Sequence, residues 1–117
     1  MKKMDKDGML LCELQAKTFE LSLKLTETSS EIFIRRFMNS DVAKMLDNTS
    51  ILETNLQPQD IIESIQEQYG VSHYGSVKYT ENEMYWIGYL YRFFAYTYEL
   101  QSRRVYKIVK SKELRGL

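Results

Sequence analysis

TENEMYWIGYLYRFFAYTYEL, residues 80–100, is the stretch that decides the fold. It places eight aromatic side chains, most of the aromatic content of the chain, in one segment with large apolar groups on every side of a helix. Such a helix has no polar face, so we expect it to be the central helix of a small domain or to meet a partner. Thr80 and Glu83 form a capping box that predicts a start near Glu81, and Gly88 predicts a close crossing by another helix.

Amphipathic patterns predict further helices on both sides of this segment. Residues 1–7 are polar and without periodicity, so we expect a disordered terminus there. The other expected helices span residues 8–26, 28–39, 41–46, 58–69 and 102–109. The final residues, from Ser111 onward, either continue the last helix or form a separate turn.

Capping residues place several of these boundaries. Thr28 and Glu31 have the spacing of a capping box, Asn39 and Ser40 are the possible caps of the short helix that follows, and Ser102 is the expected cap of the last. Residues 51–57 read as a loop or a brief extended piece. Residues 71–79 read as a connecting loop, with a short strand or hairpin arm as the alternative.

These patterns predict an all-α protein. At 117 residues the chain fits one domain, residues 1–117, that buries a core without disulfides or metals. We expect a compact bundle of five to six helices around the aromatic-rich helix at residues 81–100. No segment approaches the apolar length of a membrane span, no signal peptide is visible, and the single Cys12 reads as a buried core residue. A cytoplasmic protein is therefore expected.

No motif for catalysis, a metal or a cofactor is visible. His73 is the only histidine, which excludes a two-histidine zinc motif, and the sequence has no glycine-rich phosphate loop and no nucleophile elbow. We expect His73 to be a loop residue that makes local hydrogen bonds, with a role as general base as the weaker alternative. The chain is therefore expected not to be an enzyme, with no catalytic residue, cofactor or metal.

Three arginines lie among large apolar residues. Arg35 and Arg36 lie in the expected helix 28–39, and Arg92 lies within the aromatic run. A guanidinium does not deprotonate, so each of them needs a carboxylate, a carbonyl or an anionic ligand. The expected internal partners are Glu31, Asp41, Glu83 and Glu99. The alternative is a clamp for a phosphate or for a partner's carboxylate.

Charge is unevenly distributed along the chain. Residues 1–70 hold eight basic and twelve acidic residues, whereas residues 71–117 hold eight basic and four acidic residues, so the two parts carry about −4 and +4. The basic residues of the C-terminal segment include Arg103, Arg104, Lys107 and Lys110. They indicate a solvated helix face or, alternatively, contacts with phosphate groups.

Three stretches carry a family resemblance: SSEIFIRRFMNSDVAKMLD (29–47), YGVSHYGSVKYTENEMYWIGYLYR (69–92) and YELQSRRVYKIVKSKELRGL (98–117). Over residues 15–117 the chain resembles a family of small, largely uncharacterised bacterial proteins, common in Firmicutes and often encoded beside an ADP-ribosyltransferase-type toxin. The resemblance implies an accessory or antitoxin-like role and supplies no catalytic residues. Members continue past the equivalent of Leu117 with another short helix, so the resemblance implies a shortened member or a truncated chain, with part of its core or interface uncovered.

The function expected from the sequence is that of a protein-binding module, antitoxin-like or regulatory, for a toxin-like enzyme encoded next to it. Its richness in Tyr, Met and Arg matches the residue types of interface centres. The expected partner-binding residues are Arg35, Arg36, Tyr91, Arg92 and Tyr98. A homodimer is compatible with the pattern. The alternative is a nucleic-acid or nucleotide (ADP-ribose-like) binding protein that uses Arg103, Arg104, Lys107 and Lys110.

Overall fold

The computed structural model describes residues 1–116 and is all-α, as the sequence predicts. Its first helix, α1, spans Lys6–Leu25. The carboxylate of Asp5 accepts a hydrogen bond from the backbone amide of Gly8 at 2.9 Å, which caps the helix. The helix therefore begins earlier than expected, and Lys6 and Asp7, which the sequence placed in a disordered terminus, form its first turn. The backbone amide of Lys2 also donates to the carbonyl of Thr97 at 2.6 Å.

Helices α2 (Ser30–Met38) and α3 (Asp41–Leu46) follow. Ser40 caps α3 as predicted, but the predicted capping box at Thr28 does not form. Ser29 caps α2 instead, because the hydroxyl of Thr28 donates to the carbonyl of Tyr74 at 2.8 Å. A contact with a distant loop thus replaces the local cap.

The next segment contains a 3-10 helix, η1 (Thr49–Thr54), where the sequence predicted a loop or an extended piece. The side chain of Asn48 caps it, and Asn55 ends it with a left-handed φ of 55°. Helix α4 (Pro58–Tyr69) has proline in its first turn and Gly70 after its last residue, as predicted.

Residues 70–80 connect α4 to the next helix without forming a strand. They lie instead along the N-terminal end of α2. The backbone amides of Ser29 and Ser30 donate to the carbonyls of Tyr74 and Val77, each at 3.1 Å. Because these bonds go to a helix end and not to a second extended segment, the predicted alternative of a strand or hairpin arm is wrong for the described residues.

The aromatic helix α5 spans Glu81–Thr97 and begins with the predicted capping box of Thr80 and Glu83. It ends before the expected Leu100, because Glu99 adopts a left-handed φ of 54°. Its most extensive contact is with α1. A Cβ atom built on Gly88 would lie 2.9 Å from the backbone oxygen of Gln15, so the predicted close crossing at this glycine is confirmed.

Two short helices end the described chain: α6 (Ser102–Ile108) and α7 (Ser111–Arg115). The turn after Ser111 is therefore separate from the preceding helix, one of the two predicted outcomes. Ser102 is the first residue of α6 and not its cap, because Gln101 holds the capping position. The side chain of Ser102 makes contacts elsewhere in the fold.

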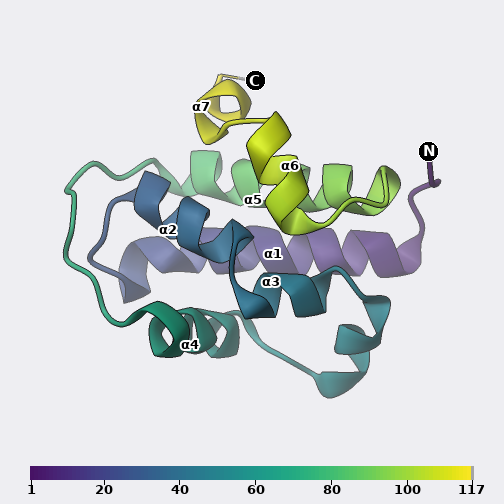
Figure 1. Ribbon diagram of the computed structural model, residues 1–117, viewed down its shortest axis with the longest axis horizontal. Helices are drawn as coiled ribbons and strands as arrows, with labels where there is room; N and C mark the ends of the chain where they lie inside the picture. The colour runs from purple at the N-terminus through teal and green to yellow at the C-terminus, as the bar shows by residue number, and fades with distance from the viewer. Residues whose placement is uncertain (117) are drawn as a thin grey trace.

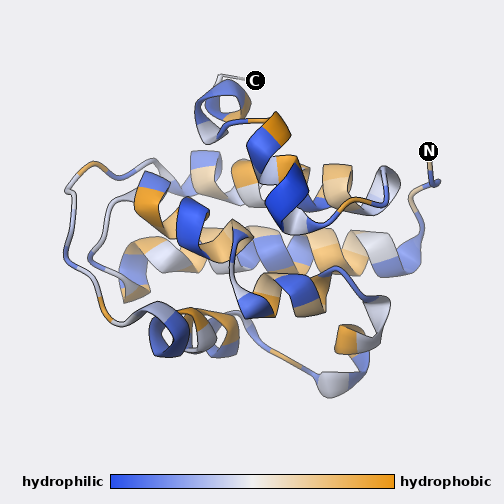
Figure 2. Cartoon of the chain, viewed as in Figure 1, coloured by the Kyte–Doolittle hydropathy of each residue, from blue (hydrophilic) through white to orange (hydrophobic). Residues whose placement is uncertain are grey.

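The helices form two layers. In Figure 1, α1 and α5 run side by side behind α2, α3 and α6, while α4 lies below them and α7 lies at the top. One continuous cluster of buried side chains fills the space between the layers, and the apolar residues of α1 and α5 alternate with polar ones along each ribbon (Figure 2). Tyr91 is the only one of the eight rings of residues 80–100 that is buried, so α5 is central but not enclosed on every side. Among the described residues, no helix combines the length and apolarity needed to cross a membrane.

Candidate functional site

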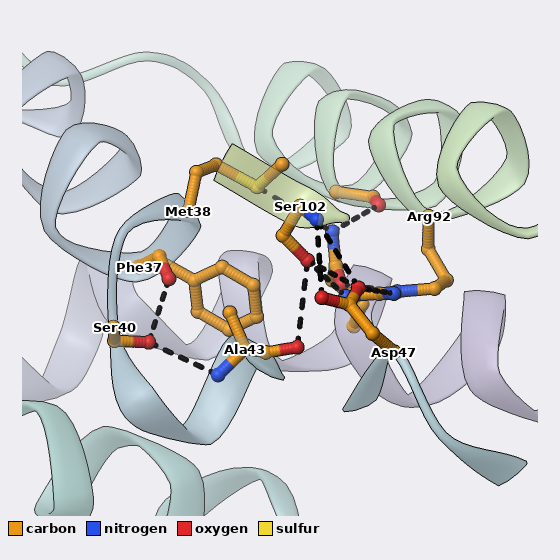
Figure 3. A network of polar contacts seen from close by, with 9 residues as sticks. Phe37, Met38, Ser40, Ala43, Asp47, Arg92 and Ser102 are labelled. Atoms are coloured by element: carbon orange, nitrogen blue, oxygen red, sulfur yellow. Dashed lines mark hydrogen bonds and ion pairs between the residues drawn. The ribbon is translucent and has the colours of Figure 1, made fainter. Parts of the chain in front are cut away.

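Arg92 is buried at the point where α5 faces α1, α3 and α6 (Figure 3). Its Nε donates to the side-chain oxygen of Gln15 at 2.8 Å, and its Nη1 donates to Oδ1 of Asp47 at 2.6 Å. Its Nη2 donates to the hydroxyl of Ser102 at 2.7 Å. Each nitrogen of the guanidinium therefore has a partner within the fold.

The charge of Arg92 is balanced internally. Burial lowers the pKa of Arg92, and the adjacent carboxylate of Asp47 opposes that shift. Asp47 also accepts from the hydroxyl and the backbone amide of Ser102. The internal ion pair that the sequence predicts is confirmed, but its carboxylate is Asp47, which was not among the four expected partners.

Tyr91 is also internal. Its side chain is buried, and its hydroxyl donates to the backbone carbonyl of Val109 at 2.8 Å. Burial raises the pKa of Tyr91, because the phenolate would lose its hydration. Tyr91 and Arg92 therefore do not lie on the surface, which corrects the expectation that both contact a partner.

The two arginines of α2 have different environments. Arg36 is half-buried, donates to the carbonyl of Gly70 at 2.8 Å, and lies 5.5 Å from the ring centre of Tyr69. This contact holds the end of α4 against α2. Arg35 is exposed, lines a cleft, and forms no ion pair within residues 1–116.

An apolar groove runs between the C-terminal end of α5 and α6. Its volume is about 320 Å³. Tyr98 and Ile108 line it and are 55% and 57% exposed. The remaining lining residues are all apolar: Phe94, Leu100, Val105 and Val109. Of the expected partner-binding residues, Tyr98 is the one in this groove.

The predicted basic segment is divided between two surfaces. Arg103, Arg104 and Lys107 are exposed on α6, the helix that forms one wall of the apolar groove. Lys110 follows α6 and lines a different cleft. None of the four forms an ion pair within the described residues. The groove is thus bordered by a helix with a positive exposed face.

A second apolar surface lies along α5. The rings of Tyr85, Trp86 and Tyr89 contact one another, with centre-to-centre distances of 5.3, 5.4 and 6.5 Å. Trp86 is 48% exposed and the two tyrosines are half-buried. These three rings form an aromatic edge of α5 that is separate from the α5–α6 groove.

A polar cleft of about 580 Å³ lies between α2, the loop at residues 74–77, and the α6–α7 connection. Arg35, Lys110 and Lys112 contribute positive charges to it, and Glu31 contributes the only carboxylate among its lining residues. The sequence prediction included Arg35 and Lys110 but assigned them to different sites. Only the fold brings the two residues together.

His73 and Cys12 remain outside these surfaces. The imidazole of His73 pairs with Glu27, and both side chains are largely exposed, in keeping with local contacts of a loop histidine. Cys12 is buried, and burial raises the pKa of its thiol to about 11. The thiol is therefore protonated at neutral pH.

The sequence did not identify several residues of the buried polar group and of the apolar groove. In the sequence, Asp47 is part of a polar break and Ser102 is an expected helix cap. Their contacts with Arg92 are tertiary, across 45 and 10 positions of the chain respectively, so local patterns do not predict them. Ile108 was expected only as one of the apolar residues of the helix at residues 102–109, and the sequence does not show that it is exposed. No protein-family model, no curated protein and no solved structure matches the chain. The proposed function therefore rests on the surfaces of the protein described above.

Proposed function

We propose that this chain is a protein-binding module that holds an amphipathic segment of a partner protein in the α5–α6 groove. The observation that carries the proposal is the exposure of Tyr98 and Ile108, each more than half accessible, in a groove with an apolar lining. Apolar side chains that are exposed together in one groove, unlike single exposed ones, are typical of interaction surfaces. A concave surface of this kind suits the apolar face of a partner helix.

The charges around the groove define the complementary surface of the partner. Arg103, Arg104 and Lys107 project from the helix that forms one wall. Acidic residues beside the apolar anchors of the partner would meet these cations, which favours fast association and a defined orientation. The proposed ligand is therefore a segment with apolar residues on one face and Asp or Glu on its flanks.

The family resemblance supports a specific kind of partner. Its members are often encoded beside an ADP-ribosyltransferase-type toxin, and the chain has no catalytic motif of its own. We therefore assign it an antitoxin-like or regulatory role toward a toxin-like enzyme encoded next to it. The groove of Tyr98 and Ile108 replaces the buried Tyr91 and Arg92 as the proposed contact.

Co-purification tests the proposal. The chain is co-expressed with the product of the adjacent gene, and the complex is measured by size-exclusion chromatography and calorimetry. The double variant Tyr98→Ser with Ile108→Ser should bind at least tenfold more weakly, because it removes the apolar anchors. Met45→Ser is the matched control, since Met45 is 51% exposed on α3 away from the groove, and it should bind as the wild type does.

Two results would overturn this assignment. The first is elution as separate proteins at micromolar concentration. The second is a complex that persists with the groove variants but is weakened by Trp86→Ser. In that case the partner would contact the aromatic edge of α5 and not the groove. Far-ultraviolet circular dichroism of each variant confirms that the fold is retained.

A further inference from the structure

The cleft between α2, residues 74–77 and the α6–α7 connection has the chemistry of a small-molecule site. Its volume of about 580 Å³ lies within the range of ligand pockets in proteins. Its walls come from three segments that are far apart in the sequence. Helix α6 contributes Tyr106 to this cleft and Ile108 to the apolar groove, so the two surfaces are distinct.

Three cations in this cleft have no anionic partner within residues 1–116: Arg35, Lys110 and Lys112. Glu31 also lines the cleft, and its carboxylate accepts a hydrogen bond from the hydroxyl of Tyr79 at 2.8 Å. The four side chains together carry a net charge of about +2. The cleft therefore favours a ligand with two or more negative charges.

The cations do not lie at random around the cleft. Nζ of Lys110 lies 5.1 Å from the ring centre of Tyr106, so the aromatic face holds this ammonium group over the cleft wall. Arg35 lines the same cleft as Tyr106 and Lys110. Burial and the charge of Glu31 raise the pKa of Tyr106, whereas the charge of Arg35 opposes this shift. Phosphate oxygens accept hydrogen bonds from both guanidinium and ammonium groups.

A further aromatic ring is available to a ligand. Tyr74 lines the cleft and is 76% exposed, and its backbone is held by the bond from the amide of Ser29. Gly75 follows with a φ of 79°, and a Cβ atom built there would lie 2.8 Å from the Cβ atom of Ser29. The glycine thereby lets this loop lie against α2, with Tyr74 beside the cations. Exposed tyrosine rings stack on nucleobases.

We propose that this cleft binds a nucleoside phosphate, with the phosphates held by Arg35, Lys110 and Lys112 and the base stacked on Tyr74. The proposal is independent of the protein-binding groove. The three cations without an ion pair in the described residues would bind the phosphate groups, and the exposed ring of Tyr74 in the same cleft would stack on the base.

Calorimetric titration at low ionic strength tests this site with four probes: ADP, AMP, inorganic pyrophosphate and adenosine. ADP should bind with a dissociation constant below about 1 mM. AMP and pyrophosphate should bind more weakly than ADP, and adenosine should bind most weakly. Raising the salt concentration should weaken ADP binding, because the contacts are ionic.

Variants separate the two halves of the site. Arg35→Gln and Lys112→Gln should each weaken ADP binding at least fivefold, whereas Tyr74→Ser should weaken ADP binding and leave pyrophosphate binding unchanged. Lys44→Gln, which changes an exposed cation on α3, is the control and should have no effect. Ile108→Ser should also bind ADP as the wild type does, because Ile108 lines the groove and not the cleft. A failure of the groove proposal can then be distinguished from a failure of the nucleotide site.

Three outcomes would overturn the nucleotide site. One is absence of ADP binding up to millimolar concentration. Another is equal binding of ADP by the wild type and Arg35→Gln, with unchanged circular dichroism. The third is equal affinity for ADP and pyrophosphate, which would mean that the cleft recognises phosphate alone and that Tyr74 holds no base.

Discussion

At the scale of single residues, Arg92 shows how a buried cation is accommodated. The residue is 1% exposed, yet every nitrogen of its guanidinium has a hydrogen-bond partner. One partner is the carboxylate of Asp47 and the other two are neutral. Removing Arg92 leaves the buried side-chain oxygen of Gln15 without its donor, and an unsatisfied buried acceptor costs more than the intact hydrogen bond contributes.

Arg92→Met should therefore destabilise the protein by about 1 to 3 kcal/mol, because the substitution leaves the buried side-chain oxygen of Gln15 without its donor and removes the cation paired with Asp47. The measurement is the free energy of unfolding from urea titration followed by circular dichroism. Arg103→Met is the control on the exposed face of α6 and should change this free energy by about 0.5 kcal/mol or less. Equal stability of Arg92→Met and the wild type would show that the ion pair is dispensable.

The sequence predicts that Arg92 needs a partner but not which one. That the guanidinium requires an anion or carbonyl follows from its chemistry alone. The identity of the partner depends on how α3 is placed against α5, and Asp47 lies 45 residues away in a polar stretch that reads as a simple break. Similarly, Tyr98 and Tyr91 look alike in the sequence, and only the fold exposes the first and buries the second.

At the scale of elements, the α1–α5 pair depends on a close approach at Gly88. The position for a Cβ atom lies 2.8 Å from a ring carbon of Phe19 and 2.9 Å from the backbone oxygen of Gln15. Phe19 could rotate, but the backbone of Gln15 is fixed within α1. A larger residue at position 88 must therefore push the two helices apart.

Gly88→Ala should lower the stability by about 1 to 3 kcal/mol, because overpacking at a backbone contact exceeds the gain of about 1 kcal/mol in helix propensity. Gly116→Ala is a matched control, since the nearest atom to its Cβ position is 3.8 Å away. It should leave the urea midpoint nearly unchanged. A higher midpoint for Gly88→Ala would mean that the crossing is loose and that helix propensity dominates.

The contribution of the start of α5 to the stability of the fold depends on pH. The capping bond from the amide of Thr80 and the ion pair with Arg115 lower the pKa of Glu83 below 4.5 in the folded state. The carboxylate therefore stabilises the fold above pH 4.5, and this contribution is lost as the pH falls through the folded-state pKa. Glu83→Gln should consequently lose less stability than the wild type between pH 6 and pH 3, as measured by urea unfolding at both values.

The control for this pH effect is Glu81→Gln, in the same helical turn but outside the capping box. Its change in stability between the two pH values should follow that of the wild type. If Glu83→Gln follows the wild type as well, the carboxylate of Glu83 does not contribute to the acid sensitivity of the fold.

Local signals in the sequence predict the elements well where tertiary contacts do not compete. Thr80 and Glu83 form their box because the one tertiary partner of Glu83, Arg115, bonds to the other carboxylate oxygen and leaves the capping oxygen free for the amide of Thr80. Thr28 and Ser102 match cap patterns equally well, but Thr28 bonds to Tyr74, and Ser102 bonds to Asp47 and Arg92. The 3-10 helix η1 was also missed, because its sequence has no helical periodicity.

At the scale of the whole molecule, the last two helices are attached to the two-layer core through polar contacts. The backbone amide and hydroxyl of Ser102 donate to Asp47 at the end of α3, and the ring hydroxyl of Tyr91 donates to Val109. Val105 and Leu114 are the fully buried apolar residues of α6 and α7, and Tyr106 is partly buried against the core. This part of the fold should therefore open more readily than α1 and α5.

Ser102→Ala should increase amide hydrogen exchange in α6 and α7 by a larger factor than in α1 and α5. The substitution removes the hydroxyl that joins Asp47 to Arg92 while the core of the α1–α5 pair stays intact. Exchange followed by mass spectrometry of peptides resolves the two regions, with Ser50→Ala in η1 as a control of similar chemistry. A uniform increase across all helices would instead indicate that the molecule opens as one unit.

Gln15 determines how α1 and α5 align along their length. Its side-chain oxygen accepts from Arg92, and its side-chain nitrogen donates to the carbonyl of Gly88 at 3.1 Å. Sliding one helix past the other by a single turn, about 5.4 Å, would leave the carboxamide and the guanidinium without these partners. The close approach at Gly88 favours the same register, because a shift by one turn would bring a residue with a side chain against the backbone of Gln15. Gln15 and Arg92 therefore fix one register of α1 against α5. Replacing Gln15 by leucine would allow other registers of the two helices, even where the total stability is unchanged.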